Sequence, residues 1–183
     1  MPKIVAKKED WINLGYRIFS EQGASGIVVE KMARILNVNK SSFYWHFKTR
    51  KVFIENLILF WIKNETDRII ILSDSKKTGS QKFKKLIDLV YKQDPFLDFI
   101  FHLKRYARKE KKAQLQIDQI DNIRIEYTVK LLLEMGYSKQ DANIKSKVLY
   151  KHFLVYHEMI RNKKQKKNYQ KEAKKEINQF IKY

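Results

Sequence analysis

Residues that break helices are scarce in this chain of 183 residues, which contains five glycines and two prolines. Proline lacks a backbone donor and glycine is conformationally free, so both interrupt long helices. Hydrophobic residues make up 44% of the chain, which is enough to form a buried core. The sequence therefore predicts an all-α protein of about nine helices.

Apolar residues recur at helical spacing along most of the chain. The N-terminal pattern predicts helices at roughly 8–22, 29–36 and 40–47, followed by a long helix that Thr49 caps and that runs to about residue 72. Five further helices are predicted at roughly 80–92, 95–108, 113–135, 139–162 and 166–182. Gly23 and Gly136 suit helix C-termini, Asn37 suits a left-handed turn, and Pro95 suits a first helical turn.

The second and third helices flank a short turn at Asn37-Val38-Asn39. Two short helices joined in this way are typical of a helix-turn-helix, whose second helix enters the major groove of DNA. We therefore predict two domains. They are a helix-turn-helix DNA-binding domain over residues 1–50, called the reading head below, and a helical body over residues 51–183.

The third helix has two distinct faces. Phe43 and Phe47 are four residues apart and share the face expected to point into the core. Its outward residues would then include two aromatic rings, which are costly to expose unless a partner covers them. The residues predicted to face DNA are Lys40, Ser41, Ser42, Tyr44, Trp45, His46, Lys48, Arg50 and Lys51. Two opposing interpretations are that residues 44–47 are all core and that the cations form an ordinary solvated surface.

The formal net charge is +19, from 39 Lys and Arg against 20 Asp and Glu. Such a charge attracts polyanions, with nucleic acid as the first candidate, an anionic membrane surface as the second, and a merely lysine-rich surface as the alternative. No cysteine is present, which excludes disulfides and thiol chemistry. The charged N-terminus and the lack of a long apolar run predict no secretory signal and no membrane span, and hence a cytoplasmic protein.

The sequence resembles the TetR family of bacterial transcriptional regulators over about residues 8–57. The resemblance is carried by the stretches Ile18-Phe19-Ser20-Glu21-Gln22-Gly23, Val29-Glu30-Lys31-Met32-Ala33 and Asn37-Val38-Asn39-Lys40-Ser41-Ser42-Phe43-Tyr44-Trp45-His46-Phe47-Lys48. It implies a homodimeric repressor that binds a near-palindromic double-stranded operator and leaves it when a small-molecule inducer binds the body. By position, Lys40, Ser41, Tyr44 and Trp45 would approach bases or sugars. Ser42, His46, Lys48, Arg50 and Lys51 would hold phosphates.

Three positions depart from the family pattern. Ile27-Val28-Val29 stands where a hydroxyl residue commonly caps the second helix and binds phosphate. Glu30 replaces a basic residue and would repel phosphate unless it pairs with a cation or accepts from a cytosine amino group. Asn37 replaces the usual glycine of the turn, which left-handed geometry tolerates.

The resemblance also implies an inducer pocket and a dimer interface in the body. The candidate pocket residues are Phe60, Trp61, Phe99, His102, Tyr106 and Tyr127, and the aromatic ones could equally form solid core, with His102 a satisfied core histidine. The candidate interface residues on the last two helices are Leu149, Phe153, Tyr156, Ile160, Ile177 and Phe180. These two apolar stripes either pair across a two-fold axis or face their own core.

We find no nucleophile–base set, phosphate loop or metal-ligand spacing, so we predict a protein that is not an enzyme and needs no cofactor or metal. Two other functions compete with a specific regulator. One is a nonspecific architectural nucleic-acid binder driven by charge, and the other is a membrane-surface protein that uses its basic C-terminal helix.

Overall fold

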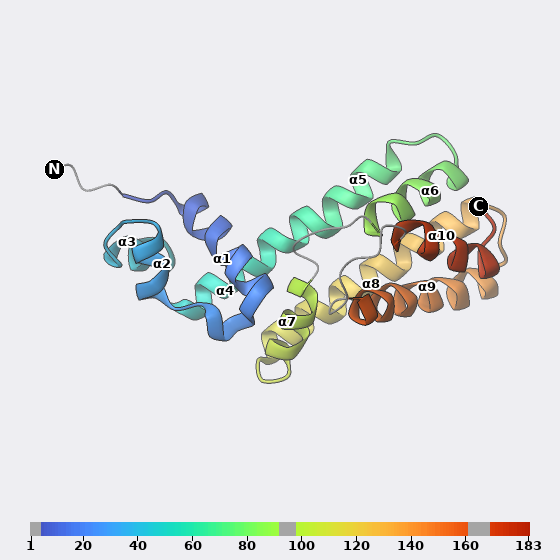
Figure 1. Ribbon diagram of the computed structural model, residues 1–183. Helices are drawn as coiled ribbons and strands as arrows, with labels where there is room; N and C mark the ends of the chain where they lie inside the picture. The colour runs from blue at the N-terminus through green and yellow to red at the C-terminus, as the bar shows by residue number, and fades with distance from the viewer. Residues whose placement is uncertain (1–4, 92–97, 161–168) are drawn as a thin grey trace. The chain divides into compact units, whose positions relative to one another are not determined.

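The computed structural model describes residues 5–91, 98–160 and 169–183 (Figure 1). Within these ranges every regular element is helical and no strand occurs, so the predicted all-α class is confirmed. The elements are α1 Lys8–Gln22, 3-10 helix η1 Gly23–Gly26, α2 Val29–Ile35, α3 Ser41–Phe47, α4 Arg50–Ile62, π-helix η2 Lys63–Asp67, α5 Arg68–Asp74, α6 Gly79–Val90, α7 Asp98–Ala107, α8 Lys111–Glu134, α9 Lys139–Ile160 and α10 Tyr169–Phe180. Pro95 lies outside the described residues. None of the described helices combines the length and apolar character that crossing a bilayer requires.

The chain divides into two compact units. The first comprises residues 1–63 and 95–117, and the second comprises residues 64–94 and 118–183. The first unit is thus larger than the predicted reading head, because it also contains α4 and α7, which both pack against α1. The functional boundary at residue 50 stays a prediction.

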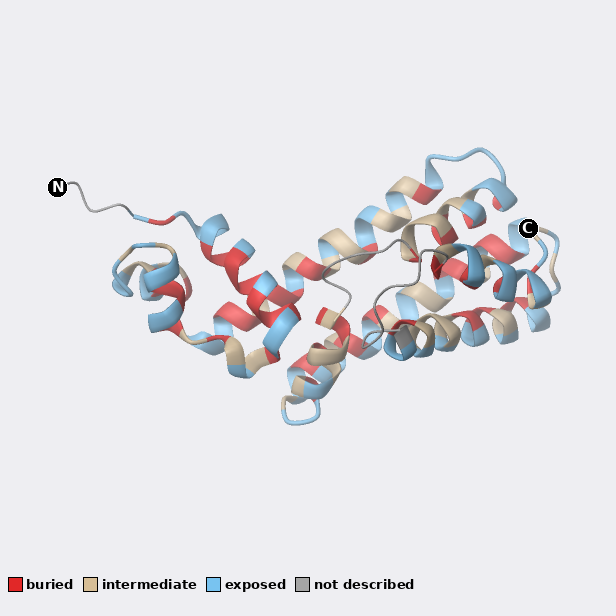
Figure 2. Cartoon of the chain, in the orientation of Figure 1, coloured by how far each residue is buried: buried red, intermediate tan, exposed pale blue. Residues whose placement is uncertain are grey.

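The core of the first unit forms where α1 packs against α2, α4 and α7. Figure 2 shows buried positions along α1. They include Trp11 and Phe19, which are both fully inaccessible to solvent. Gly15 lets α1 approach α4 closely, because a side chain there would collide with the Phe53 ring. Phe19 contacts Phe99 of α7 at a centroid distance of 4.7 Å, which joins α7 to this core.

The long helix predicted over residues 49–72 contains a π-helical turn between α4 and α5. A π turn interrupts the regular hydrogen bonds from residue i to residue i−4, so backbone groups in the turn need other hydrogen-bond partners. Arg124 of α8 supplies them within the second unit: its guanidinium donates to the Thr66 hydroxyl at 2.8 Å and to the Glu65 carbonyl at 3.1 Å. The spacing of apolar residues carries no signal for this partner, which is distant in sequence.

The second unit buries one cluster contributed by α6, α8, α9 and α10. Its fully buried members include Phe83, Ile87, Leu131 and Ile177. Gly136 ends the turn after α8 with a φ of 89°, as predicted for a glycine that closes a helix.

His157 of α9 is a buried polar member of this unit, with 3% of its surface exposed. Its Nε2 lies 3.1 Å from the Val90 carbonyl, and the Tyr169 hydroxyl lies against its Nδ1. A carbonyl only accepts, so Nε2 carries the proton and Nδ1 accepts from Tyr169. Burial lowers the pKa of His157 from 6.5 to about 4, which keeps the imidazole neutral in the folded protein.

This burial predicts a loss of stability in acid. As the pH falls below 6.5 the unfolded chain takes up a proton on His157, whereas the folded chain does so only near 4. Within that window the free energy of unfolding should fall by about 1.4 kcal/mol per pH unit from this group. His157→Gln replaces the imidazole with a side-chain amide, which still offers a donor and an acceptor but does not titrate. Urea unfolding at about pH 7 and about pH 5 should show a loss smaller by about 2 kcal/mol in the variant. Equal losses in the two proteins would contradict the assignment.

Candidate nucleic-acid interface

Helix α3 turns two phenylalanines inward and two larger aromatic rings outward. Phe43 and Phe47 are fully buried, whereas Tyr44 is 44% exposed and Trp45 is 71% exposed. Successive residues of a helix are about 100° apart, so these two pairs necessarily face different directions. The interpretation in which residues 44–47 are all core is therefore wrong for Tyr44 and Trp45.

The buried pair is held by rings from two other helices. Phe43 meets Trp11 of α1 edge to face at 5.3 Å, and it meets Phe53 of α4 at 5.0 Å. Phe47 lies 4.7 Å from the same Phe53 ring. Edge-to-face aromatic packing fixes ring orientation, so α3 is held at a defined rotation about its own axis.

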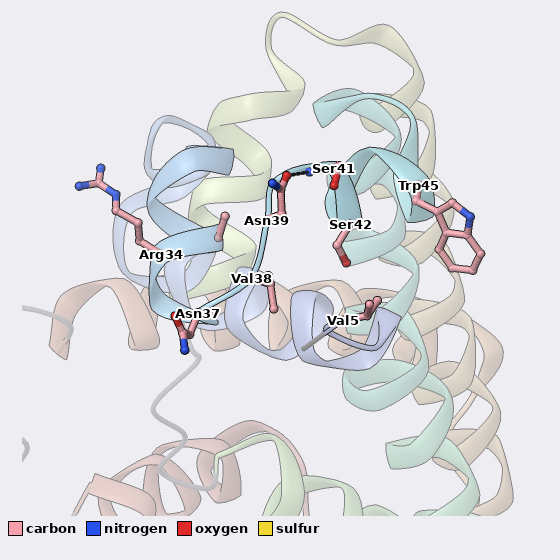
Figure 3. A pocket seen from close by; sticks show the side chains of 9 residues that line it. Val5, Arg34, Asn37, Val38, Asn39, Ser41, Ser42 and Trp45 are labelled. Carbon is pink, nitrogen blue, oxygen red and sulfur yellow. Dashed lines mark hydrogen bonds between the residues drawn. The ribbon is translucent and has the colours of Figure 1, made fainter. Parts of the chain in front are cut away.

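The turn before α3 is set by two asparagines. Asn37 has a φ of 53°, the left-handed conformation predicted for it, and the Val38 amide donates to the Ala33 carbonyl at 3.0 Å. The Asn39 side chain then accepts from the Ser41 amide at 2.9 Å (Figure 3). This contact satisfies a free amide at the start of α3.

Lys40 is paired with the unusual carboxylate of α2. Its ammonium lies 3.3 Å from Glu30 Oε1, and both side chains are more than half exposed. A backbone hydrogen bond at its own residue and then the Lys40 contact lower the pKa of Glu30. Glu30 therefore pairs with a cation, which was one of the two ways to limit its repulsion of phosphate.

Two of the predicted phosphate ligands contact the segment before α1. The His46 Nε2 lies 3.0 Å from the Ala6 carbonyl, and the Ser42 hydroxyl donates to the same oxygen at 3.4 Å. Both side chains are half-buried. They therefore hold residues 5–7 against α3 in the free protein.

A groove of about 700 Å³ lies beside α3. Its lining residues come from the segment before α1, from the end of α2, from the turn and from α3: Val5, Ala33, Arg34, Asn37, Val38, Asn39, Ser41, Ser42 and Trp45. In Figure 3 the Trp45 ring extends away from α3 at one edge of this groove, and Arg34 extends from α2. Arg34, Asn39 and Val5 were not among the residues predicted to face DNA. The available signal was that Asn39 belongs to the helix-turn-helix turn and that Arg34 lies shortly before it.

The chain leaves α3 through a tight turn centred on Lys48. Its φ of 61° and ψ of −47° are rare for a residue with a side chain, and the Thr49 amide donates to the Phe47 carbonyl at 2.6 Å across it. The Thr49 hydroxyl then caps α4 by accepting from the Val52 amide at 3.1 Å. Lys48 is thus exposed on a strained backbone.

Arg50 and Lys51, the two cations that open α4, are already engaged within the first unit. The Arg50 guanidinium donates to the Ile27 carbonyl at 2.8 Å and also to the Ala24 carbonyl, so it secures the segment ahead of α2. The Lys51 ammonium donates to Glu110 at 2.8 Å. Sequence reasoning identified both cations but not these partners, which lie at least 23 residues away along the chain.

The candidate inducer-pocket residues do not gather in one unit. Trp61 and Phe99 are buried and stack at 5.6 Å in the first unit. Phe60 meets Tyr16 at 5.3 Å, while His102 and Tyr106 each lie 6.5 Å from Phe19 between ring centroids. Tyr127 belongs to the second unit, where its hydroxyl donates to Asp74 at 3.0 Å. Trp61 and Phe99 therefore belong to the core of the first unit, whereas Phe60 and Tyr106 are partly exposed.

The candidate interface residues of the last two helices pack largely into their own unit. Leu149 and Ile177 are buried in its core, and Phe153, Tyr156 and Phe180 pack half-buried against it. The side chain of Ile160 lies outside the described residues. The opposite face of α9 instead exposes Ile144, Val148, Val155 and Met159, each with more than two fifths of its surface accessible.

Comparison with solved structures shows which fold this is. A TetR transcriptional regulator from Legionella pneumophila matches with a TM-score of 0.77 and 17% identity over 100% of both chains. The chain has the TetR fold. A regulator from Saccharomonospora viridis solved with choline also matches at 0.79 with 12% identity, covering 96% of this chain and 95% of that one. A TerR/AcrR-family regulator from Aquifex aeolicus matches at 0.70 with 19% identity, covering 95% and 99%.

A sequence relative points the same way as the TetR fold. The negative transcriptional regulator IcaR of the icaADBC biofilm operon in Staphylococcus aureus is 30% identical over 103 residues. The match covers 55% of this chain and 50% of IcaR, so the chain spans about half the length of the curated relatives it matches. No family model matches the chain. The predicted resemblance to the TetR family is confirmed in the fold, and the relatives named here are described as transcriptional regulators.

The strained turn at Lys48 predicts that replacing this lysine with glycine raises the stability of the protein but weakens its binding to DNA. Lys48→Gly removes the side chain that disfavours a positive φ, so the free energy of unfolding should rise by about 1 kcal/mol. It also removes an ammonium from the predicted phosphate surface, so affinity for duplex DNA should fall. Lys31→Gly, within the ordinary backbone of α2, should instead lose about 1 kcal/mol. Urea unfolding and fluorescence anisotropy with a labelled duplex measure the two effects. A less stable Lys48→Gly protein would refute the strain argument.

Proposed function

We propose that this chain is a DNA-binding transcriptional regulator whose helix α3 reads the major groove. The observation that carries the proposal is the exposure of Tyr44 and Trp45 on a helix whose opposite face is fixed by buried phenylalanines. Such rings can pack against thymine methyls and sugars, while the Ser41 hydroxyl can reach a base edge or a phosphate. The TetR fold supports the same placement of α3.

Charge around α3 supports the same partner. Lys48 stands exposed at its C-terminal end, and Arg34 lines the groove beside it. The net charge of +19 strengthens attraction to any duplex, and contacts by α3 would add selectivity. This combination favours a sequence-specific regulator over an architectural binder that depends on charge alone.

We extend the proposal to a homodimer that pairs through the exposed face of α9. Ile144, Val148, Val155 and Met159 are four, seven and four residues apart, which forms one continuous stripe on a helix. A two-fold axis beside Val155 would place exposed Lys151 opposite Glu158 of a second copy, so the charges on the stripe are complementary.

Repression, and release by a small molecule, form the finer part of the proposal. IcaR is named a negative regulator, which favours repression here. An inducer would act by changing the separation of the two reading heads, because operator half-sites lie about 34–36 Å apart. The half-exposed rings of Phe60, which contacts Tyr16, and of His102 and Tyr106, which contact Phe19, are the entry point that we propose for such a ligand.

Selection from a random duplex pool tests the DNA-binding role. The wild-type protein should enrich a near-palindromic sequence and keep it against excess random DNA, and enrichment of no sequence would favour the architectural binder.

Tyr44→Ala should lose affinity for the enriched duplex by about tenfold or more while its melting temperature stays nearly unchanged. Leu59→Ala, which truncates a 56% exposed side chain on α4, is the matched control and should bind normally. A large fall in the stability of Tyr44→Ala would show that the ring is core.

A charge placed on the α9 stripe tests the dimer. Val155→Glu brings two carboxylates together across the proposed axis, so light scattering should show a monomer where the wild-type protein is a dimer. Ile71→Glu makes a comparable change at a 68% exposed position on α5 and should leave the dimer intact. A dimeric Val155→Glu protein would place the interface elsewhere.

A further inference from the structure

Lys51 stands in the first turn of α4, separated from α3 only by the turn at Lys48 and Thr49. The resemblance to the TetR family implies that its ammonium holds a DNA phosphate. In the structure that ammonium instead lies 2.8 Å from Glu110 Oε2. The hydrogen bond that the ammonium donates to this carboxylate, and then the negative charge of the carboxylate, raise the pKa of Lys51. The cation is therefore partly neutralised before any DNA arrives.

Backbone hydrogen bonds on both sides fix the position of Glu110 in the chain. It lies between α7 and α8, where its amide donates to the Ala107 carbonyl at 3.1 Å and its carbonyl accepts from the Gln114 amide at 3.0 Å. The Glu110 side chain is 31% exposed, against 59% for Lys51. The carboxylate is thus the more fixed partner, and the lysine is the one that can leave.

A second ion pair of opposite polarity joins the same two segments. Glu55, one turn further along α4, lies 3.0 Å from the Lys112 ammonium near the start of α8. The packing of Phe19 on Phe99 also holds α7 against α1 within this unit. These contacts keep the Glu110 carboxylate beside the end of α4 that follows α3.

We propose that Glu110 competes with DNA phosphate for the Lys51 ammonium and thereby limits the affinity of the reading head for DNA. The inference rests on the proposed function, because it assumes that a duplex approaches α3 and the start of α4. On binding, Lys51 must leave Glu110 to reach a phosphate, or stay and contribute no phosphate contact. In either case the nearby carboxylate repels the DNA backbone. A shift of the segment between α7 and α8 would then alter DNA affinity without any change in α3.

The test compares charge-matched variants on a mixed-sequence duplex of about three helical turns. Glu110→Gln should bind it about fivefold more tightly at low salt, and the slope of log K against log salt should steepen by about 0.9, the value for one added phosphate contact. Glu55→Gln removes the same charge from α4 and breaks the second ion pair, but it leaves Lys51 paired. Its effect on the affinity and its effect on the salt slope should each be less than half of the effect of Glu110→Gln.

Lys51→Gln, alone and combined with Glu110→Gln, completes the experiment. Lys51→Gln alone should flatten the salt slope little. In the Glu110→Gln background, the same substitution should abolish both the tighter binding and the steeper salt slope. An unchanged slope in Glu110→Gln, or equal effects of Glu110→Gln and Glu55→Gln, overturns the competition while leaving DNA binding in place. A wild-type protein that does not bind the duplex overturns the proposed function itself.

Discussion

The contact of Phe43 and Phe47 with Trp11 and Phe53 determines what α3 can present to a partner. A seven-residue helix has too few internal hydrogen bonds to be stable alone, so its position depends on packing. Four rings from three helices supply that packing and leave one rotation available. Every residue predicted to contact DNA from α3 takes its direction from this aromatic cluster.

Electrostatics around α3 combine attraction with restraint. The chain carries a large positive charge, yet a lysine near each end of α3 is paired with a carboxylate, Lys40 with Glu30 and Lys51 with Glu110. Exposed pairs of this kind contribute little to stability, so a phosphate can displace them. In the proposed DNA-binding role, these pairs would reduce the general attraction to any duplex. Recognition then depends more on contacts that only the correct sequence supplies.

Local features of the sequence sufficed to predict the three helices that precede α4. Periodicity gave α1, α2 and α3 to within a residue or two, and the short polar side chain of Asn37 predicted its left-handed turn. Partners distant in sequence could not be predicted in this way. The contacts of Arg124 with the π turn and of Arg50 with the Ile27 carbonyl have no periodic signature, because they depend on how helices pack.

Helix α9 shows why the candidate interface could not be chosen from periodicity. Leu149 and Val148 are neighbours in sequence, but Leu149 is 5% exposed and Val148 is 43% exposed. The helix therefore carries apolar side chains on two faces, and periodicity cannot tell which face meets the rest of its own chain. Because Leu149 is buried in the core, the exposed stripe lies on the other face of the helix. In the proposed homodimer, pairing with a second copy would remove these four apolar side chains from water on both copies.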